Sequence, residues 1–203
     1  MRFSQLPVGI YRTIYPQAVF ELQNKKEIAL TFDDGPTPKV TEFVLNTLNA
    51  HSIKATFFCV GQNIEKYPDL YRQIIQDGHI VGNHTFHHLN GWKTVNHRYF
   101  ESIEQTNKYC SSSLFRPPYG KIKWSQYHYL LQKKYQIVFW NLISYDYHPQ
   151  MTFEKCWQIL SKNTVGGQIV LFHDSEKSFG LISKILPRYI EFCEKLNLTF
   201  VPL

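Results

Sequence analysis

Two adjacent carboxylates, Asp33 and Asp34, stand at the end of the apolar run IALTF and directly before a Gly-Pro pair. Aspartate and glycine are common turn residues, so the pair by itself also fits an ordinary turn. Two neighbouring carboxylates can instead perform two tasks in one site, with one binding a metal ion and the other accepting a proton. The other residues that could do chemistry must decide between these interpretations.

The segment HTFHH at residues 84–88 is the sharpest local signal for metal binding. His84 and His88 are four residues apart, so one helical turn would place both imidazoles on one face. This spacing is common among zinc ligands, although a histidine-rich surface loop explains it equally well. Two histidines and one aspartate would leave an open coordination position, which is typical of catalytic zinc. His87 lies off that face and fits a supporting role.

Further candidates follow later strand-like segments. Arg116 could pair with the aspartate that is not a ligand and keep it ionised, or it could form a surface salt bridge. His173 could donate a proton to a leaving group, or it could be a structural histidine. Asp146 could orient His173, or it could be a turn or helix-capping residue. The full set after these strands is Arg116, Tyr119, Ser144, Tyr145, Asp146, His173 and Asp174.

These residues need a scaffold, and the chain alternates between two patterns. Apolar, β-rich runs occur at 27–32, 54–59, 79–82, 113–116, 136–142, 167–172 and 198–202. Helix-like stretches lie between them at 38–50, 62–77, 97–109, 124–134, 152–163 and 180–196. Thr37 and Pro38 predict the start of the first of these helices, and Pro187 predicts a kink or break in the last.

Seven strands interleaved with six helices predict an α/β fold. Several strands are apolar without clean alternation, as expected for parallel strands covered on both faces. A closed or partly closed barrel and an open doubly wound sheet both fit this count. In either fold the active site gathers at the carboxyl ends of the strands, where the candidate residues stand. The first strand is not followed by GxGxxG, so dinucleotide binding has no support.

Length and composition limit the number of domains, the kinds of partner and the cellular location. The 203 residues show no repeat or linker, so we expect one domain over residues 1–203. The net charge of +6 comes from scattered Lys and Arg, which argues against a nucleic-acid partner. No apolar run is long enough for a membrane span, and the first 22 residues lack a secretory signal, so a cytoplasmic location is the default expectation. The four cysteines form no CxxC pair and fit reduced thiols. The oligomeric state is left open.

Five short motifs occur together in one order: TFDDG, HTFHH, RPPYG, the Asp-Tyr pair at 146–147 and IVLFH. In this combination the chain resembles the polysaccharide deacetylase family, carbohydrate esterase family four, from about residue 27 to 173. The resemblance implies a single-domain, distorted parallel (β/α) barrel of seven or eight strands. It also implies a divalent metal, most often zinc, with cobalt, nickel or manganese as alternatives.

The resemblance further implies a role for each matching residue. Asp33 corresponds to the base and Asp34 to a metal ligand, with His84 and His88 as the other two ligands. Arg116 corresponds to the arginine that positions the base. His173 corresponds to the general acid, and Asp146 to the residue that tunes it. The backbone amide of Tyr119 corresponds to the group that stabilises the oxyanion, and Leu171 to part of the pocket for the acetyl methyl group. The family often has tryptophan at Tyr147 and aspartate at Ile143, so the shape of the acetyl pocket is expected to differ here.

The activity that follows is hydrolysis of an acetyl group by metal-bound water. An N-acetyl group on a polysaccharide containing N-acetylglucosamine, such as peptidoglycan or chitin oligomers, is the leading expectation. Removal of O-acetyl groups from xylan is an alternative. Two histidines and one carboxylate also occur in non-haem iron oxygenases. A catalytically silent carbohydrate-binding relative is the last alternative, since aromatic residues make up 16% of the chain and can stack on sugars.

Overall fold

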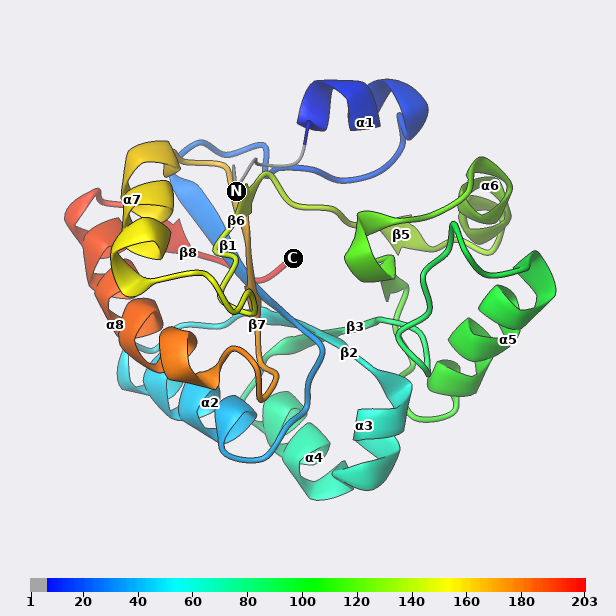
Figure 1. Ribbon diagram of the computed structural model, residues 1–203, viewed down its shortest axis with the longest axis horizontal. Coiled ribbons are helices and arrows are strands. Elements are labelled where there is room, and N and C mark those ends of the chain that lie inside the picture. The colour runs from blue at the N-terminus through cyan, green and yellow to red at the C-terminus, as the bar shows by residue number, and fades with distance from the viewer. Residues whose placement is uncertain (1–6) are drawn as a thin grey trace.

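A single parallel sheet forms the centre of the molecule (Figure 1). The computed structural model describes residues 7–203; the first six residues of the predicted domain, which also begin the segment expected to lack a secretory signal, lie outside it. Within 7–203 the strand order is β5-β4-β3-β2-β1-β7-β6, with β8 pairing beside β1. The strands are β1 (Glu27–Asp33), β2 (Thr56–Cys59), β3 (Ile80–Asn83), β4 (Leu114–Phe115), β5 (Gln136–Ile137), β6 (Leu142–Ile143), β7 (Ile169–His173) and β8 (Thr199–Phe200).

Helices surround the sheet on its outer side (Figure 1). They are α1 (Val8–Ile14), α2 (Val40–Ala50), α3 (Gly61–Lys66), α4 (Pro68–Gln76), α5 (Asn96–Asn107), α6 (Trp124–Gln132), α7 (Phe153–Asn163) and α8 (Phe179–Lys195), with a 3₁₀ turn, η1 (Pro118–Gly120). The predicted α/β fold is therefore confirmed. Over the described part of the chain, each helix is too short or too polar to cross a membrane.

The predicted strand at 136–142 is wrong as a single element. It divides into β5 and β6, which lie at opposite edges of the sheet. Only four residues separate them, so the two edges lie at most about 17 Å apart along the chain. The sheet must curl to bring its edges this close, which produces a distorted, partly closed barrel. The linking residues are held by hydrogen bonds to both sides, from the Val138 amide to Phe115 and from the Asn141 amide to Ile169.

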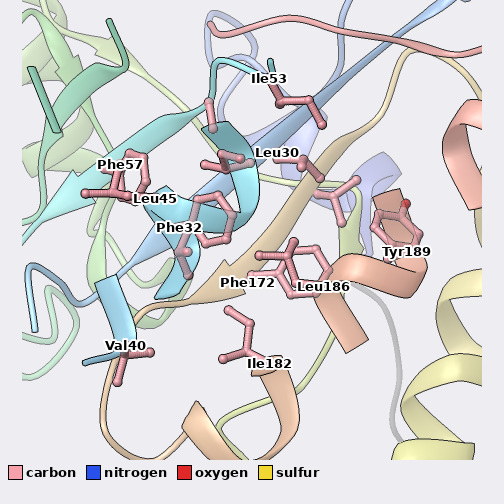
Figure 2. Packing of buried hydrophobic residues seen from close by; sticks show 14 of the residues in the cluster. Leu30, Phe32, Val40, Leu45, Ile53, Phe57, Phe172, Ile182, Leu186 and Tyr189 are labelled. Carbon is pink, nitrogen blue, oxygen red and sulfur yellow. The ribbon is translucent and has the colours of Figure 1, made fainter. Parts of the chain in front are cut away.

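The main core lies between the sheet and helices α2 and α8 (Figure 2). Leu30 and Phe32 of β1 and Phe172 of β7 point into it and contact Leu45 and Leu186 from the helices. The intervening β1 residues point to the barrel interior, because side chains alternate along a strand. Both faces of β1 are thus covered, which explains why its apolar residues do not alternate with exposed polar ones.

Several helix boundaries differ from the prediction. The stretch 62–77 forms two helices, because Pro68 has no amide hydrogen to continue α3 and instead begins α4. Helix α2 begins at Val40 rather than at Pro38, since Lys39 has a positive φ of 67° that interrupts helical geometry. Helix α8 continues unbroken through Pro187, where its buried face packs against the core. Helix α1 was not predicted and buries no residue completely.

Candidate active site

Strand alternation in β1 and β7 brings acid and base side chains into the barrel interior. Asp33 is in register with His173, and Thr31 is in register with Leu171. Residues two apart on a strand share a face, so these four side chains line the same interior surface. Asp33 and His173 end their strands, as expected for an active site at the carboxyl end of the sheet.

Asp33 is held by a buried arginine. Arg116 Nη1 lies 2.8 Å from Asp33 Oδ1 and also donates to Thr31 Oγ1 at 2.7 Å. The guanidinium is completely buried, and it lies against the faces of Phe58 and Trp140. The contact predicted for Arg116 therefore exists, and the alternative of a surface salt bridge is wrong. The ion pair fixes one carboxylate oxygen of Asp33 and leaves Oδ2 directed toward His84.

Asp34, His84 and His88 form one cluster of three donor groups. One atom from each lies within 4.8 Å of the other two. His88 Nε2 is 3.1 Å from Asp34 Oδ1, and His84 Nε2 is 3.8 Å from the same oxygen. Ligands about 2.1 Å from a tetrahedral ion lie about 3.4 Å apart, so these separations fit a bound cation. The second oxygen of Asp33 lies beside the cluster, 3.7 Å from His84 Nε2.

Both histidines present the same ring nitrogen to the cluster. His84 Nδ1 lies 2.8 Å from the backbone carbonyl of Arg116, which can only accept, so Nδ1 carries the hydrogen. His88 Nδ1 lies 3.1 Å from the hydroxyl of Tyr119. The Nε2 atom of His84 is then available as a ligand, and the Tyr119 hydroxyl orients the His88 ring so that its Nε2 faces Asp34. The donor set therefore fits a divalent ion such as zinc.

The loop that carries the histidines is not helical. Thr85 and His88 have positive φ values of 62° and 52°, so the predicted helical turn is wrong. The Thr85 amide donates to Asn83 Oδ1 and the Leu89 amide donates to Thr85 Oγ1, which hold the bend. The loop brings the imidazoles together by a different path from a helix. His87 is exposed and points outside the cluster.

Burial tunes the charges of this cluster. Burial lowers the pKa of His84 to about 4, so its imidazole is neutral at pH 7 and can donate a lone pair. For Asp34, burial opposes ionisation, but its contact with His88 and the positive charge of His173 hold its pKa well below the usual range. A divalent cation requires an ionised carboxylate and unprotonated imidazole nitrogens as ligands, and the pKa shifts of Asp34 and His84 agree with this requirement.

His173 and Asp146 form a second buried pair. Asp146 Oδ1 lies 2.8 Å from His173 Nδ1, and Asp146 Oδ2 accepts the His173 amide at 2.9 Å. Ser144 Oγ donates to Asp146 Oδ1 at 2.9 Å, which satisfies the carboxylate further. Burial alone would lower the pKa of His173, but the charge and hydrogen bond of Asp146 raise it to about 9. The predicted contact between Asp146 and His173 is present.

Asp174 holds the turn after β1 in place, a structural role that the sequence did not predict. It is buried and accepts hydrogen bonds from the Gly35 amide at 2.9 Å and from Thr41 Oγ1 at 2.6 Å. A side chain at residue 35 would collide with it, since a Cβ there would lie 1.9 Å from Asp174 Oδ2. Asp174 thus fixes the turn directly after Asp34. Its position beside His173 at a strand end was the available signal.

The cluster opens into a cavity of about 400 Å³. Its apolar wall includes Leu171, Tyr147, Trp140 and Ile143, and the Tyr147 ring lies 4.5 Å from that of His173. Tyr119 stands at the edge, 59% exposed. The predicted substrate-contacting residues therefore share this cavity. A larger cavity of about 650 Å³ beside Val19 and Val138 has no histidine in its lining, so volume alone does not identify the site.

We predict that Arg116→Met destabilises the fold by about 3–5 kcal/mol, because it leaves the Asp33 carboxylate buried without its counter-ion. Urea unfolding measures this loss. Arg116→Met combined with Asp33→Asn should recover part of the stability, since the buried charge is then absent. An equal loss in the single and double variants would show that packing of the guanidinium, and not the ion pair, accounts for the effect.

Comparison with known proteins gives the family. Residues 21–140 match the family model for polysaccharide deacetylase. A peptidoglycan-N-acetylglucosamine deacetylase of Bacillus cereus is 33% identical over 81% of this chain and 64% of its own length. A chitooligosaccharide deacetylase of Azorhizobium caulinodans is 34% identical over 80% of each chain.

A solved structure agrees with both the sequence match and the fold. The crystal structure of a peptidoglycan N-acetylglucosamine deacetylase, in complex with an N-oxidanyl-benzamide, has a TM-score of 0.88 and 30% identity. The similarity covers 98% of this chain and 95% of that one. The family matched by sequence and structure is the one suggested by the five motifs. The chain therefore belongs to the polysaccharide deacetylase family.

Proposed function

We propose that this chain is a metal-dependent deacetylase that hydrolyses the N-acetyl group of N-acetylglucosamine units in a polysaccharide. One observation carries the proposal. A buried Asp33, fixed by Arg116, directs its free oxygen at the cluster of Asp34, His84 and His88. A structural ion pair would not require a second carboxylate and two imidazoles at its open side. The named activities of the two curated relatives agree with this substrate class.

Asp34, His84 and His88 are the residues that would hold the cation, with zinc as the proposed ion. A divalent cation there supplies Lewis acidity and lowers the pKa of bound water to roughly 7. Three protein ligands leave a position open, as in catalytic rather than structural sites. The hydrogen bonds of the two Nδ1 atoms keep the imidazoles oriented so that each Nε2 faces Asp34.

Asp33 serves as the general base. As water attacks the carbonyl carbon of the acetyl group, its proton passes to Asp33 Oδ2, while Oδ1 stays bound to Arg116. The guanidinium lies only 2.8 Å from Oδ1 and places a positive charge beside the base. The fixed pair also prevents the base from turning away from the cluster.

His173 serves as the general acid, at the end of strand β7 next to Asp33 at the end of β1. When the carbon–nitrogen bond breaks, the nitrogen takes a proton from His173 Nε2, and the products are acetate and a free amine. Asp146 holds the other ring nitrogen and maintains the protonated state. The Tyr119 amide would stabilise negative charge on the acetyl oxygen, and Leu171 would contact the acetyl methyl group.

The alkaline limit of activity should report His173. Because this acid must be protonated, kcat/KM should fall as pH rises through about 9. Asp146→Asn removes the charge that raises this pKa and leaves burial, which lowers it, so the limit should move to lower pH. A pH–rate profile measures the shift, with exposed Asp69→Asn as the control. An unmoved alkaline limit in Asp146→Asn would contradict the assignment.

The same shift has a consequence for folding. The folded-state pKa of His173 lies above the ordinary value of 6.5. Protonated His173 therefore stabilises the fold fully below about pH 6.5, and this contribution is lost as pH rises through about 9.

The direct test is acetate release by zinc-loaded protein from chitin oligomers, peptidoglycan fragments and acetylxylan. The proposal expects release from at least one N-acetylated glycan. Release only from acetylxylan would instead identify an O-acetyl esterase. Sugar binding without any release would identify a silent relative, and oxygen-dependent turnover with iron would identify an oxygenase.

A further inference from the structure

A tryptophan and a lysine stand together beside the mouth of the active-site cavity. Trp92 is 52% exposed, although it is one of the largest apolar side chains. Its indole Nε1 donates to the backbone carbonyl of Ile122 at 3.0 Å, and its amide donates to Asn90 Oδ1 at 3.1 Å. The first hydrogen bond fixes the ring at the surface, and the second holds the backbone that carries it.

The loop that carries Trp92 is bound tightly to the segment that carries Lys121. The Gly91 amide donates to the Lys121 carbonyl at 3.1 Å, and Gln126 Nε2 donates back to the Gly91 carbonyl at 3.1 Å. A Cβ at residue 91 would lie 2.5 Å from the Lys121 carbonyl oxygen, so only glycine permits this approach. Trp92 and Lys121 therefore form one preorganised unit.

The Lys121 ammonium lies over the Trp92 ring, 5.4 Å from its centroid, and Lys121 also lines the active-site cavity. Such a cation–π contact restrains a side chain that would otherwise move freely. Lys177 lines the same cavity from the segment after β7. Within residues 7–203 neither lysine forms an ion pair, whereas Asp33 and Asp34 of the cavity have cationic or histidine partners. The cavity mouth thus offers positive charge that the protein does not neutralise.

We propose that Lys121, positioned by Trp92, binds a carboxylate on the sugar next to the one that is deacetylated. The preferred substrate is then an N-acetylated glycan with acidic substituents rather than a neutral one. This inference rests on the proposed function, because it concerns the same cavity. Lys121 is the specificity-determining residue, and Trp92 acts through it as a positioning residue.

The experiment compares two glycans of equal length. One is the neutral tetramer of N-acetylglucosamine, and the other alternates N-acetylglucosamine with the carboxylate-bearing N-acetylmuramic acid. The ratio of kcat/KM for the acidic over the neutral tetramer is measured for wild type, Lys121→Gln, Trp92→Leu and the double variant. Lys133→Gln is the matched control, because its ammonium lies 5.7 Å over the Tyr129 ring but outside this cavity.

We expect wild type to prefer the acidic tetramer, and Lys121→Gln to lower that preference about fivefold, the size of an exposed ion pair. Trp92→Leu should lower it less, and the double variant should add nothing to Lys121→Gln, since both residues act through one ammonium. Raising the salt concentration should weaken the wild-type preference. Lys133→Gln should leave it unchanged.

Two results would overturn the inference while leaving the proposed function intact. One is acetate release with a preference that Lys121→Gln does not change, and the other is an equal loss in Lys133→Gln, which would indicate general surface charge. If neither tetramer releases acetate, the proposed function fails by itself. The ratio of the two dissociation constants, measured by calorimetry in the same variants, then supports or overturns the inference directly.

Discussion

Asp33→Asn is expected to reduce kcat by about 10²–10⁴-fold, the contribution of a positioned general base, while leaving cation affinity close to that of wild type. The amide has the shape of the carboxylate, and its oxygen can still accept from Arg116. It cannot take a proton from water. It also removes no member of the Asp34, His84 and His88 cluster. Acetate release and metal content measured on the same preparation test both halves of the expectation.

Folding must be controlled for in this variant, because Arg116 would then be buried without a counter-ion. A urea unfolding curve shows whether the protein remains folded under assay conditions. Loss of turnover in a folded, metal-loaded Asp33→Asn protein supports the assignment of the base. Turnover within a few fold of wild type would assign the base elsewhere, and loss of the bound cation would show instead that Asp33 contributes to the metal site.

Asp34→Asn should have the complementary effect and weaken cation binding by about 100-fold or more. Mutation of a residue that only hydrogen-bonds to a metal ligand already lowers metal affinity by about 10–100-fold. Asp34 contributes the only carboxylate of the three-residue cluster, with its oxygen 3.1 Å from His88 Nε2 and 3.8 Å from His84 Nε2. Removing its charge leaves two neutral imidazoles, which bind a divalent cation weakly. Calorimetric titration of metal-stripped protein with zinc measures the change.

The histidine loop provides a matched pair of controls. His84→Asn should weaken zinc binding, because it removes a buried ligand nitrogen. His87→Asn lies in the same loop and changes an exposed imidazole that is outside the cluster, so it should leave the affinity unchanged. If the two variants bind zinc equally well, the assignment of the cluster as the metal site is wrong.

The sequence predicted the candidate site well because strand ends are easy to recognise. Asp33, Arg116 and His173 each follow a short apolar run, and parallel strands bring such ends to one edge of the sheet. Asp146, which contacts His173 in the fold, was recognisable because it also follows a strand-like run. The positions of these residues depend on where strands end and on side-chain alternation, which local patterns reveal.

Features that depend on long-range packing could not be predicted in the same way. The histidine loop reaches its geometry through positive φ values at Thr85 and His88, not through the helical spacing that suggested it. The division of 136–142 into β5 and β6 depends on closure of the whole sheet. Asp174 gains its role from Gly35 and Thr41, which are more than 130 residues away in sequence.

The metal dependence of the reaction is tested most directly by titrating metal-stripped protein with zinc during hydrolysis of an N-acetylglucosamine oligomer. Acetate release is expected to rise in proportion to the bound cation and to saturate at about one ion per chain, as one three-ligand cluster requires. Stripped protein that releases acetate as fast as loaded protein would contradict it. So would fully loaded protein that releases no acetate from any N-acetylated glycan.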